Sequence, residues 1–188
     1  MATEHAFAPY VRALGKGKRG SRSLTQAEAR DAMAMILQQQ VEPEQLGAFL
    51  MLLRLKEETP QELAGFVEAV RAHHQYSPAL VSGIQVDLDW STYAGKKRHL
   101  PWFLLAALTL ADQGIKVFMH GAKGHTAGRI YSEDVLTAIG LPIAHNWQQC
   151  QTQLQQHNFS FMSLQQLSPA LDHIIGLRAI FGLRSPVH

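Results

Sequence analysis

The sequence predicts an α/β protein built from a helical N-terminal module, residues 1–78, and an α/β domain with a parallel sheet, residues 79–188. Apolar residues recur at helical spacing through the first 74 residues. From residue 84 onward, short strand-like segments alternate with helical ones. Such alternation is typical of right-handed βαβ units and a parallel sheet. Residues 77–83 form the predicted junction between the two parts.

The helices of the first half begin at recognisable capping sequences. Residues 6–14 favour a short helix, which three closely spaced glycines end. Thr25 and Glu28 form a capping box, in which each side chain bonds to the backbone of the other residue. That box starts a helix through Gln40, and Pro43 suits the first turn of the next helix.

A second capping box, Thr59 to Glu62, starts the last helix of the module, which runs through His74. Its spacing places four apolar side chains inward: Leu63, Phe66, Val67 and Val70. In the preceding helix, the run from Phe49 to Leu53 is apolar on more than one face. A helix of this kind is buried by more than its own chain.

Strands and helices of the second half follow from their apolar patterns. The predicted strands are Ile84–Leu88, Ile115–Met119 and Phe159–Met162. Whether Leu141–Ala144 forms a further short strand is left open. The predicted helices are Pro101–Gln113, Glu133–Ile139 and Trp147–His157. Because this sheet lacks a closing element, we expect the chain to be either a fragment or a chain truncated at its C-terminus compared with its relatives.

Composition excludes several classes of protein. The hydrophobic content of 46% is too high for a disordered chain. A single cysteine, Cys150, excludes a disulfide framework, and the ten scattered histidines lack partners at ligand spacing, so we expect no metal and no cofactor. No apolar run reaches the roughly 18 residues of a membrane span, and no signal peptide is visible. We therefore expect a cytoplasmic protein.

Positive charge is concentrated in two segments, although the formal net charge is only +2. Residues 5–27 hold no acid and five basic residues: Arg12, Lys16, Lys18, Arg19 and Arg22. The intervening glycines let the backbone follow a phosphate chain, and the cations release counterions when they bind it. A solvated flexible loop is the competing interpretation, because short basic runs are common.

The second segment, residues 90–132, holds one acid and six basic residues: Lys96, Lys97, Arg98, Lys116, Lys123 and Arg129. Trp90, Tyr93 and Trp102 lie nearby, and cations interleaved with aromatic rings suit single-stranded nucleic acid. The alternative is that both tryptophans belong to the core. For Trp102, inside an apolar helix, the core is favoured, and Tyr93 is left open.

A glycine-containing turn follows the second predicted strand. It contains His120, Gly121 and Gly124, and its backbone N–H groups suit a phosphate. The glycines also fit a turn that serves chain geometry alone, and the residues do not separate these two interpretations.

Several segments together carry a family resemblance: Ser23–Ala29, Gln45–Lys56, Glu57–Phe66, Val86–Leu88, Met119–Gly124 and Gly176–Phe181. In this order and spacing, the chain resembles the anthranilate phosphoribosyltransferase superfamily, glycosyltransferase family 3, from about residue 8 to its end. The resemblance implies a helical domain that dimerises. It also implies an α/β domain that binds phosphoribosyl pyrophosphate at its strand ends.

The catalytic motifs of that family are replaced here. Residues 90–94, Trp-Ser-Thr-Tyr-Ala, stand where the enzymes have a Gly-Thr-Gly-Gly-Asp loop whose bare backbone cradles pyrophosphate. Leu100 to Phe103 replace a segment with phosphate-binding hydroxyls, and Asp172 aligns with the arginine that binds anthranilate. The Asp-Glu pair that holds Mg²⁺ has no counterpart in the sequence. His120, Gly121 and Gly124 are thus a vestigial phosphate site.

This combination resembles a non-catalytic, DNA-binding branch of the superfamily. The prediction is a homodimer without catalytic residues that binds nucleic acid regardless of sequence and has no membrane association. Its phosphate contacts would come from Arg12, Lys16, Lys18, Arg19, Arg22, Lys96, Lys97, Arg98, Lys123 and Arg129. Two alternatives stay open: a phosphoribosyltransferase or phosphorylase with an altered acceptor, and a dimeric scaffold for a protein partner.

Overall fold

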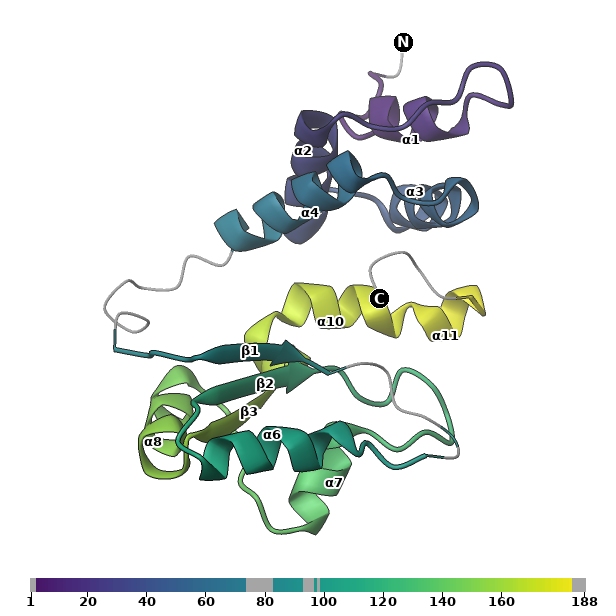
Figure 1. The fold of residues 1–188 in the computed structure, drawn as a ribbon. Helices are drawn as coiled ribbons and strands as arrows, with labels where there is room; N and C mark the ends of the chain where they lie inside the picture. Colours follow the sequence, from purple (N-terminus) through teal and green to yellow (C-terminus); the bar gives the residue numbers. More distant parts are fainter. Residues whose placement is uncertain (1–2, 74–82, 93–96, 98, 184–188) are drawn as a thin grey trace. The chain divides into compact units, whose positions relative to one another are not determined.

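A computed structural model describes residues 3–73, 83–92, 97 and 99–183 (Figure 1). The chain divides into two compact units. One is helical and comprises Met1–Gln75 with Ile180–His188, and the other is the α/β unit, Tyr76–Ala179.

The helical unit contains α1 (Ala8–Gly15), α2 (Gln26–Leu37), α3 (Pro43–Lys56) and α4 (Pro60–His73). Both predicted capping boxes are present. Thr25 accepts from the backbone N–H of Glu28, and Thr59 accepts from that of Glu62. A third box, which the sequence analysis missed, joins Glu42 to Gln45 at the start of α3. These caps satisfy backbone N–H groups that would otherwise have no partner within the helix.

Aromatic rings form the core of the helical unit. The ring of Phe49 lies 5.2 Å from that of Phe7 and 6.4 Å from that of Phe66, measured between centroids. The apolar face of α2 is buried as predicted: Ala29, Ala32, Met33, Ile36 and Leu37.

The predicted inward face of α4 is wrong in part. Phe66 is buried, but Leu63 and Val67 are about half exposed, at 47% and 48%. Gly65 causes this rotation, because α2 approaches it so closely that a Cβ there would lie 2.3 Å from the carbonyl oxygen of Gln26. Only glycine permits this contact, so the helix turns its glycine face toward α2.

In the α/β unit, three parallel strands form a sheet of order β1-β2-β3. The strands are β1 (Leu88–Ser91), β2 (Val117–Gly121) and β3 (Phe159–Ser163). Helix α6 (Phe103–Asp112) joins β1 to β2, while α7 (Ser132–Ala138) and α8 (Trp147–His157) lie between β2 and β3. After β3 come α9 (Leu164–Leu167), α10 (Pro169–Gly176) and α11 (Arg178–Phe181). The strand–helix alternation predicted from the sequence is therefore confirmed.

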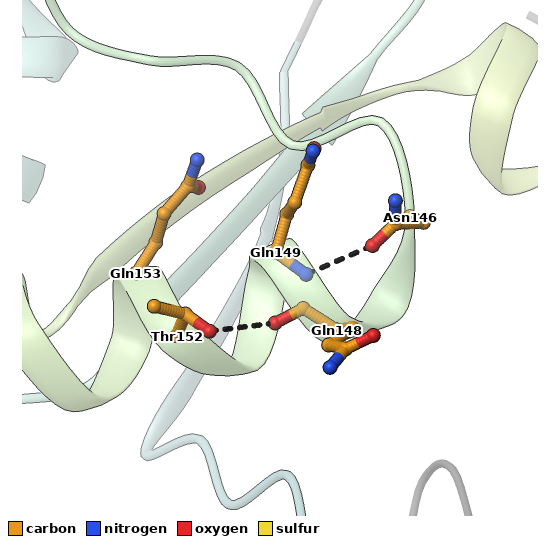
Figure 2. A pocket seen from close by; sticks show the side chains of 5 residues that line it. All are labelled: Asn146, Gln148, Gln149, Thr152 and Gln153. Atoms are coloured by element: carbon orange, nitrogen blue, oxygen red, sulfur yellow. Dashed lines mark hydrogen bonds between the residues drawn. The ribbon is translucent and has the colours of Figure 1, made fainter.

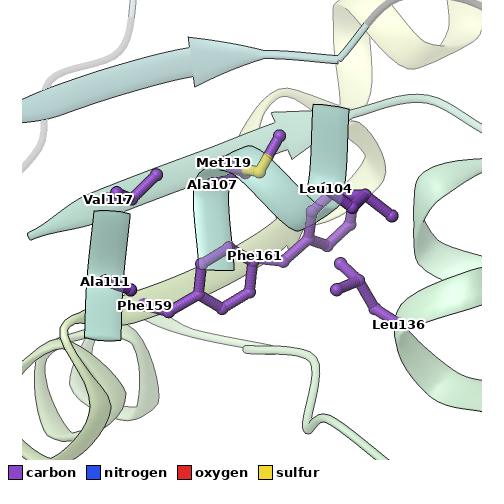
Figure 3. Packing of buried hydrophobic residues seen from close by; sticks show 8 residues of the cluster. All are labelled: Leu104, Ala107, Ala111, Val117, Met119, Leu136, Phe159 and Phe161. Carbon is purple, nitrogen blue, oxygen red and sulfur yellow. The ribbon is translucent and has the colours of Figure 1, made fainter. Parts of the chain in front are cut away.

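Side chains that alternate along the strands divide the core of this unit into two layers. On one face, Met119 and Phe161 pack with Leu104 of α6 and Leu136 of α7 (Figure 3). On the other, Phe118 and Met162 pack with the α8 residues Cys150 and Leu154. Burial raises the pKa of the Cys150 thiol, so its nucleophilic thiolate form is disfavoured.

Two strand predictions need correction. Residues 84–87 are not in a strand, because β2 begins only at Val117, which pairs with Leu88. Asp87 prepares this pairing, since its carboxylate accepts from the backbone N–H of Lys116 at 2.8 Å. Leu141–Ala144 makes only a single bridge, from Ala144 to Met162, rather than a strand.

Trp102 was predicted to lie in the core, and this is wrong, because its side chain is 64% exposed. It precedes the first turn of α6, ahead of the buried stripe that begins at Leu104. Trp90 is half-buried and packs against Phe103, while Tyr93 lies outside the described residues. No helix in the described part of the chain is long and apolar enough to cross a membrane.

Candidate functional site

The loop between α1 and α2, residues 16–25, is closed by backbone hydrogen bonds. The backbone N–H of Arg22 donates to the carbonyl oxygen of Ala13 at 2.8 Å, which closes the loop at its base. At the tip, Gly20 and Ser21 donate to the carbonyl of Gly17, whose φ of +88° favours glycine. We call this segment the α1–α2 loop.

The five cations of this region fall into two groups. Arg22 makes a two-pronged ion pair with Glu28, at 2.6 and 2.7 Å, and Arg12 pairs with Glu4. The Arg22 guanidinium and the capping Thr25 lower the pKa of Glu28 to about 2. The other three are exposed, and their side chains make no ion pair or hydrogen bond within the described residues: Lys16, Lys18 and Arg19.

A buried carboxylate anchors the end of the α1–α2 loop. Glu62 is fully buried and accepts from the backbone N–H groups of Leu24 and Thr59, both at 2.8 Å, and from Lys56 Nζ at 2.7 Å. Burial alone would raise the pKa of Glu62, but these hydrogen bonds outweigh it and hold the pKa below its ordinary value of 4.5. Lys56 also donates to Ser23.

The sequence predicted Glu62 only as part of the Thr59 capping box and did not reveal this anchoring role. The signal was present, because Glu62, Phe66 and Ala69 share the helical spacing of a buried stripe.

The second predicted site lies where the parallel strands end. Ser91, Gly121 and Ser163 close β1, β2 and β3 at the same edge of the sheet, where ligands bind in open α/β folds. Gly121 is required there, because a Cβ would lie 1.8 Å from Thr92 Oγ1. The φ of Gly124 is +78°. Chain geometry therefore accounts for both glycines of the predicted phosphate turn.

Acids accompany the basic groups at this edge. His120 Nε2 lies 3.1 Å from Asp89 Oδ1, and Lys123 makes an ion pair with Glu133, which raises the pKa of Lys123. Lys97 is exposed and Arg129 is half-buried. Two predicted residues, Lys96 and Arg98, lie outside the described part of the chain. The structure thus brings His120, Gly121, Lys123 and Gly124 together, but among negative charges.

A pocket of about 440 Å³ lies beside this turn, and we call it the strand-end pocket. Its lining comes from residues 121–124, Glu133 of α7, His145, residues 163–166 and Asp172 of α10. Burial raises the pKa of Asp172, and the negative charge of Glu133 adds to this rise. Within the described residues, no group of three or more His, Cys, Asp or Glu side chains is placed to hold a metal ion.

A second pocket, of about 420 Å³, lies along the first turns of α8 and is lined only by uncharged polar side chains (Figure 2). Asn146 accepts from the backbone N–H of Gln149 at 2.9 Å and caps the helix. Thr152 donates to the carbonyl of Gln148 at 3.0 Å. Asn146 and Thr152 are therefore engaged in hydrogen bonds within the helix. Because every lining side chain is uncharged, this pocket offers no charge to a ligand.

Two family models match most of the chain. The helical bundle domain of a glycosyl transferase family matches residues 8–74, and its α/β domain matches residues 103–185. The chain belongs to glycosyl transferase family 3. Residues 75–102, which contain β1, lie between the two matched ranges.

Several curated proteins resemble this glycosyl transferase family 3 chain. Anthranilate phosphoribosyltransferase from Methylocella silvestris is 34% identical over 174 residues, which cover 92% of this chain and 48% of the relative. The uncharacterized protein YbiB from Escherichia coli K12 is 27% identical over 178 residues, 95% of this chain and 55% of that protein. The chain therefore spans about half the length of the curated relatives it matches.

Among solved structures, anthranilate phosphoribosyltransferase (TrpD) from Thermus thermophilus has the same fold. The TM-score is 0.74 at 22% sequence identity, covering 98% of this chain and 53% of that one. A helical bundle followed by a parallel-sheet domain was predicted, and this comparison confirms it.

Proposed function

We propose that this chain binds nucleic acid through its phosphates, without reading the base sequence, and that the α1–α2 loop makes the main contact. One observation carries the proposal. Lys16, Lys18 and Arg19 are exposed, have no acidic partner within the described residues, and lie on a loop closed by backbone hydrogen bonds. Uncompensated cations held close together are what a phosphate chain attracts.

The closure of this loop by backbone hydrogen bonds strengthens the proposal. Binding costs less free energy when the cations need not be gathered first, because less conformational entropy is lost. The glycines at 17 and 20 also keep the tip free of bulk, so a phosphate can approach the backbone.

Contributions from the α/β unit are expected to be smaller. Lys97 is exposed and suits a phosphate contact, as Lys96 and Arg98 do in sequence. Lys123 and His120 each have an acid beside them, which offsets their attraction for an anion.

We include a homodimer formed through the helical unit in the proposal. Among its described residues, this unit exposes five large apolar side chains: Leu55, Leu63, Val67, Ile180 and Leu183. Covering them against a second copy would bury apolar surface and present two α1–α2 loops to one nucleic acid. Two loops on one dimer raise the apparent affinity through effective concentration.

Fluorescence anisotropy with labelled DNA tests the proposal. Single strands and duplexes of unrelated sequence are titrated with the full chain at several salt concentrations. We expect similar affinities across sequences and a steep fall with salt, with a slope of about −0.9 per phosphate contacted on duplex DNA. Absence of binding at low salt, or strong preference for one sequence, would overturn it.

Phosphoribosyl transfer is a second candidate, because several relatives carry the name anthranilate phosphoribosyltransferase. Against it stands the segment Trp90–Ala94, which replaces the bare glycine backbone. A thermal-melting assay with phosphoribosyl pyrophosphate and Mg²⁺ distinguishes the two candidates. Saturable stabilisation would favour transfer chemistry, and an unchanged melting temperature would favour the nucleic-acid proposal.

A further inference from the structure

The strand-end pocket has more negative than positive charge. Its lining includes two carboxylates, Glu133 and Asp172, and one cation, Lys123. Lys123 is already paired with Oε1 of Glu133, so its charge is compensated within the pocket. With both acids ionised, one negative charge remains.

The second oxygen of Glu133 lacks a hydrogen-bond partner among the described residues. The side chain of Glu133 is only 13% exposed, and this oxygen, Oε2, is buried. A buried oxygen of this kind costs free energy unless a donor reaches it.

Asp172, the other carboxylate of the pocket, also has no hydrogen-bond donor among the described residues. It is half-buried, and within the described residues its side chain makes no ion pair. Glu133 and Asp172 line the same pocket, and burial together with the charge of Glu133 works against the ionised form of Asp172. A positive group between them would relieve both penalties.

We propose that the strand-end pocket binds a small organic cation whose ammonium or amidinium group is held by Glu133 and Asp172. The volume of about 440 Å³ fits a ligand with an organic body rather than a single ion. Ser163, Gln166 and His145 line the same pocket and offer hydrogen bonds to that body. An anionic ligand would meet the unpaired carboxylate and be repelled.

All residues that line the strand-end pocket belong to the α/β unit, so cation binding there is independent of nucleic-acid binding by the α1–α2 loop. Probes of similar shape and different charge test whether the pocket prefers a cation. Benzamidine, benzamide and benzoate share one ring and carry charges of +1, 0 and −1 at neutral pH.

Each probe is titrated into the isotopically labelled full chain, and amide chemical shifts are followed by NMR. We expect benzamidine to bind at least about tenfold more tightly than benzoate, with benzamide between them. The shifts should concentrate at residues 121–124 and 163–166. Equal or tighter binding of benzoate, binding elsewhere, or no binding of benzamidine would each overturn the proposal.

Two variants assign the effect to its residues. Asp172→Asn keeps the shape and removes the charge, and should weaken benzamidine binding roughly tenfold. Asp134→Asn removes an exposed neighbouring charge that does not line the pocket, and should change binding by less than about twofold. If both variants weaken binding equally, the pocket attracts cations only through its general field, and the assignment to Asp172 fails.

A melting curve for each variant establishes that it folds. Should Asp172→Asn not fold, Glu133→Gln takes its place. That variant leaves Lys123 without its partner and should shift the preference toward benzoate. An unchanged preference there would also contradict the proposal.

Discussion

The α1–α2 loop and the turn after β2 look alike in sequence and differ in structure. Each combines glycines with cations, and each was predicted to bind phosphate. In the first, Lys16, Lys18 and Arg19 have no acidic partner among the described residues. In the second, Glu133 compensates Lys123, and Asp89 lies beside His120. Attraction for a polyanion depends on which cations remain uncompensated, and a count of basic residues does not reveal this.

The glycines of the two segments also have different structural roles. Gly17 lies at the tip of an exposed loop, where nothing approaches within 4 Å of the position a Cβ would take. Gly121 lies against Thr92, where no room for a Cβ exists. One glycine gives the backbone a left-handed turn, while the other lets two strand ends come together.

The largest expected effect comes from releasing the anchor of the α1–α2 loop. Glu62→Gln removes the charge that Lys56 and two backbone N–H groups share, and should destabilise the fold by about 3 kcal/mol. Urea denaturation measures this loss. Because the pKa of Glu62 is depressed in the fold, its contribution is present above 4.5 and is lost as the pH falls through the folded value.

A matched control for Glu62 is Glu68→Gln on the same helix. Glu68 is exposed and accepts one hydrogen bond, from Gln26, so this change should cost less than about 0.5 kcal/mol. Similar losses for both variants would show that the buried carboxylate is not the anchor.

The next effect tests the charge difference itself. Replacing Lys16, Lys18 and Arg19 together by Gln should lower DNA affinity by roughly a hundredfold or more at 0.1 M salt and flatten the salt slope by about 2.7. Anisotropy titrations measure both quantities.

Two single variants sharpen this comparison. Lys18→Gln should weaken DNA binding about eightfold at 0.1 M salt. Lys123→Gln should weaken it by less than about twofold, because Glu133 already compensates that cation. Arg30→Gln, which removes an exposed arginine paired with Asp31 on α2, serves as the control. Equal losses for Lys18→Gln and Lys123→Gln would remove the distinction between the two segments.

A smaller effect separates the glycines. Gly121→Ala should destabilise the α/β unit by about 1–3 kcal/mol, because its Cβ would collide with Thr92. Gly20→Ala should change stability by less than about 0.5 kcal/mol, since its Cβ would chiefly meet the movable side chain of Lys16. Denaturant titration followed by a probe in each unit measures both, and comparable losses would contradict the assignment of Gly121 to close strand contact.

The smallest expected effect concerns the cation that the α1–α2 loop pairs internally. Arg22→Gln should raise the pKa of Glu28 from about 2 toward 4.5 and change the stability at neutral pH only slightly, because solvent screens this exposed pair. Because that pKa is depressed in the fold, the contribution is present above 4.5 and disappears as the pH falls through about 2. NMR titration of the Glu28 carboxyl checks the shift, and an unchanged pKa would rule out the pair in solution.

Elements fixed by local chemistry were predictable from the sequence. The capping box at Thr25 and the apolar spacing of α2 define both the start and the buried face of that helix. Helix α8, with Asn146 at its cap, begins and ends where the pattern indicates. In both cases the deciding contacts lie within a few residues of each other.

Features set by distant contacts were not predictable. The rotation of α4 depends on Gly65 meeting the backbone of α2, and the start of β1 depends on where β2 begins. For the site, the sequence located the basic residues but not their compensation. Glu133 lies ten positions from Lys123, and only the fold brings the two together.

The backbone hydrogen bond from Arg22 to Ala13 has a consequence for how the α1–α2 loop can vary. It joins the two stems of the α1–α2 loop independently of the tip, so α1 and α2 keep their register whatever the tip contains. Residues 17–20 then form a loop tip that can be replaced without changing this hydrogen bond. We expect changes in the length or charge of this segment to leave the packing of α1 and α2 intact, so that grafting different tips onto one bundle gives a graded set of polyanion affinities.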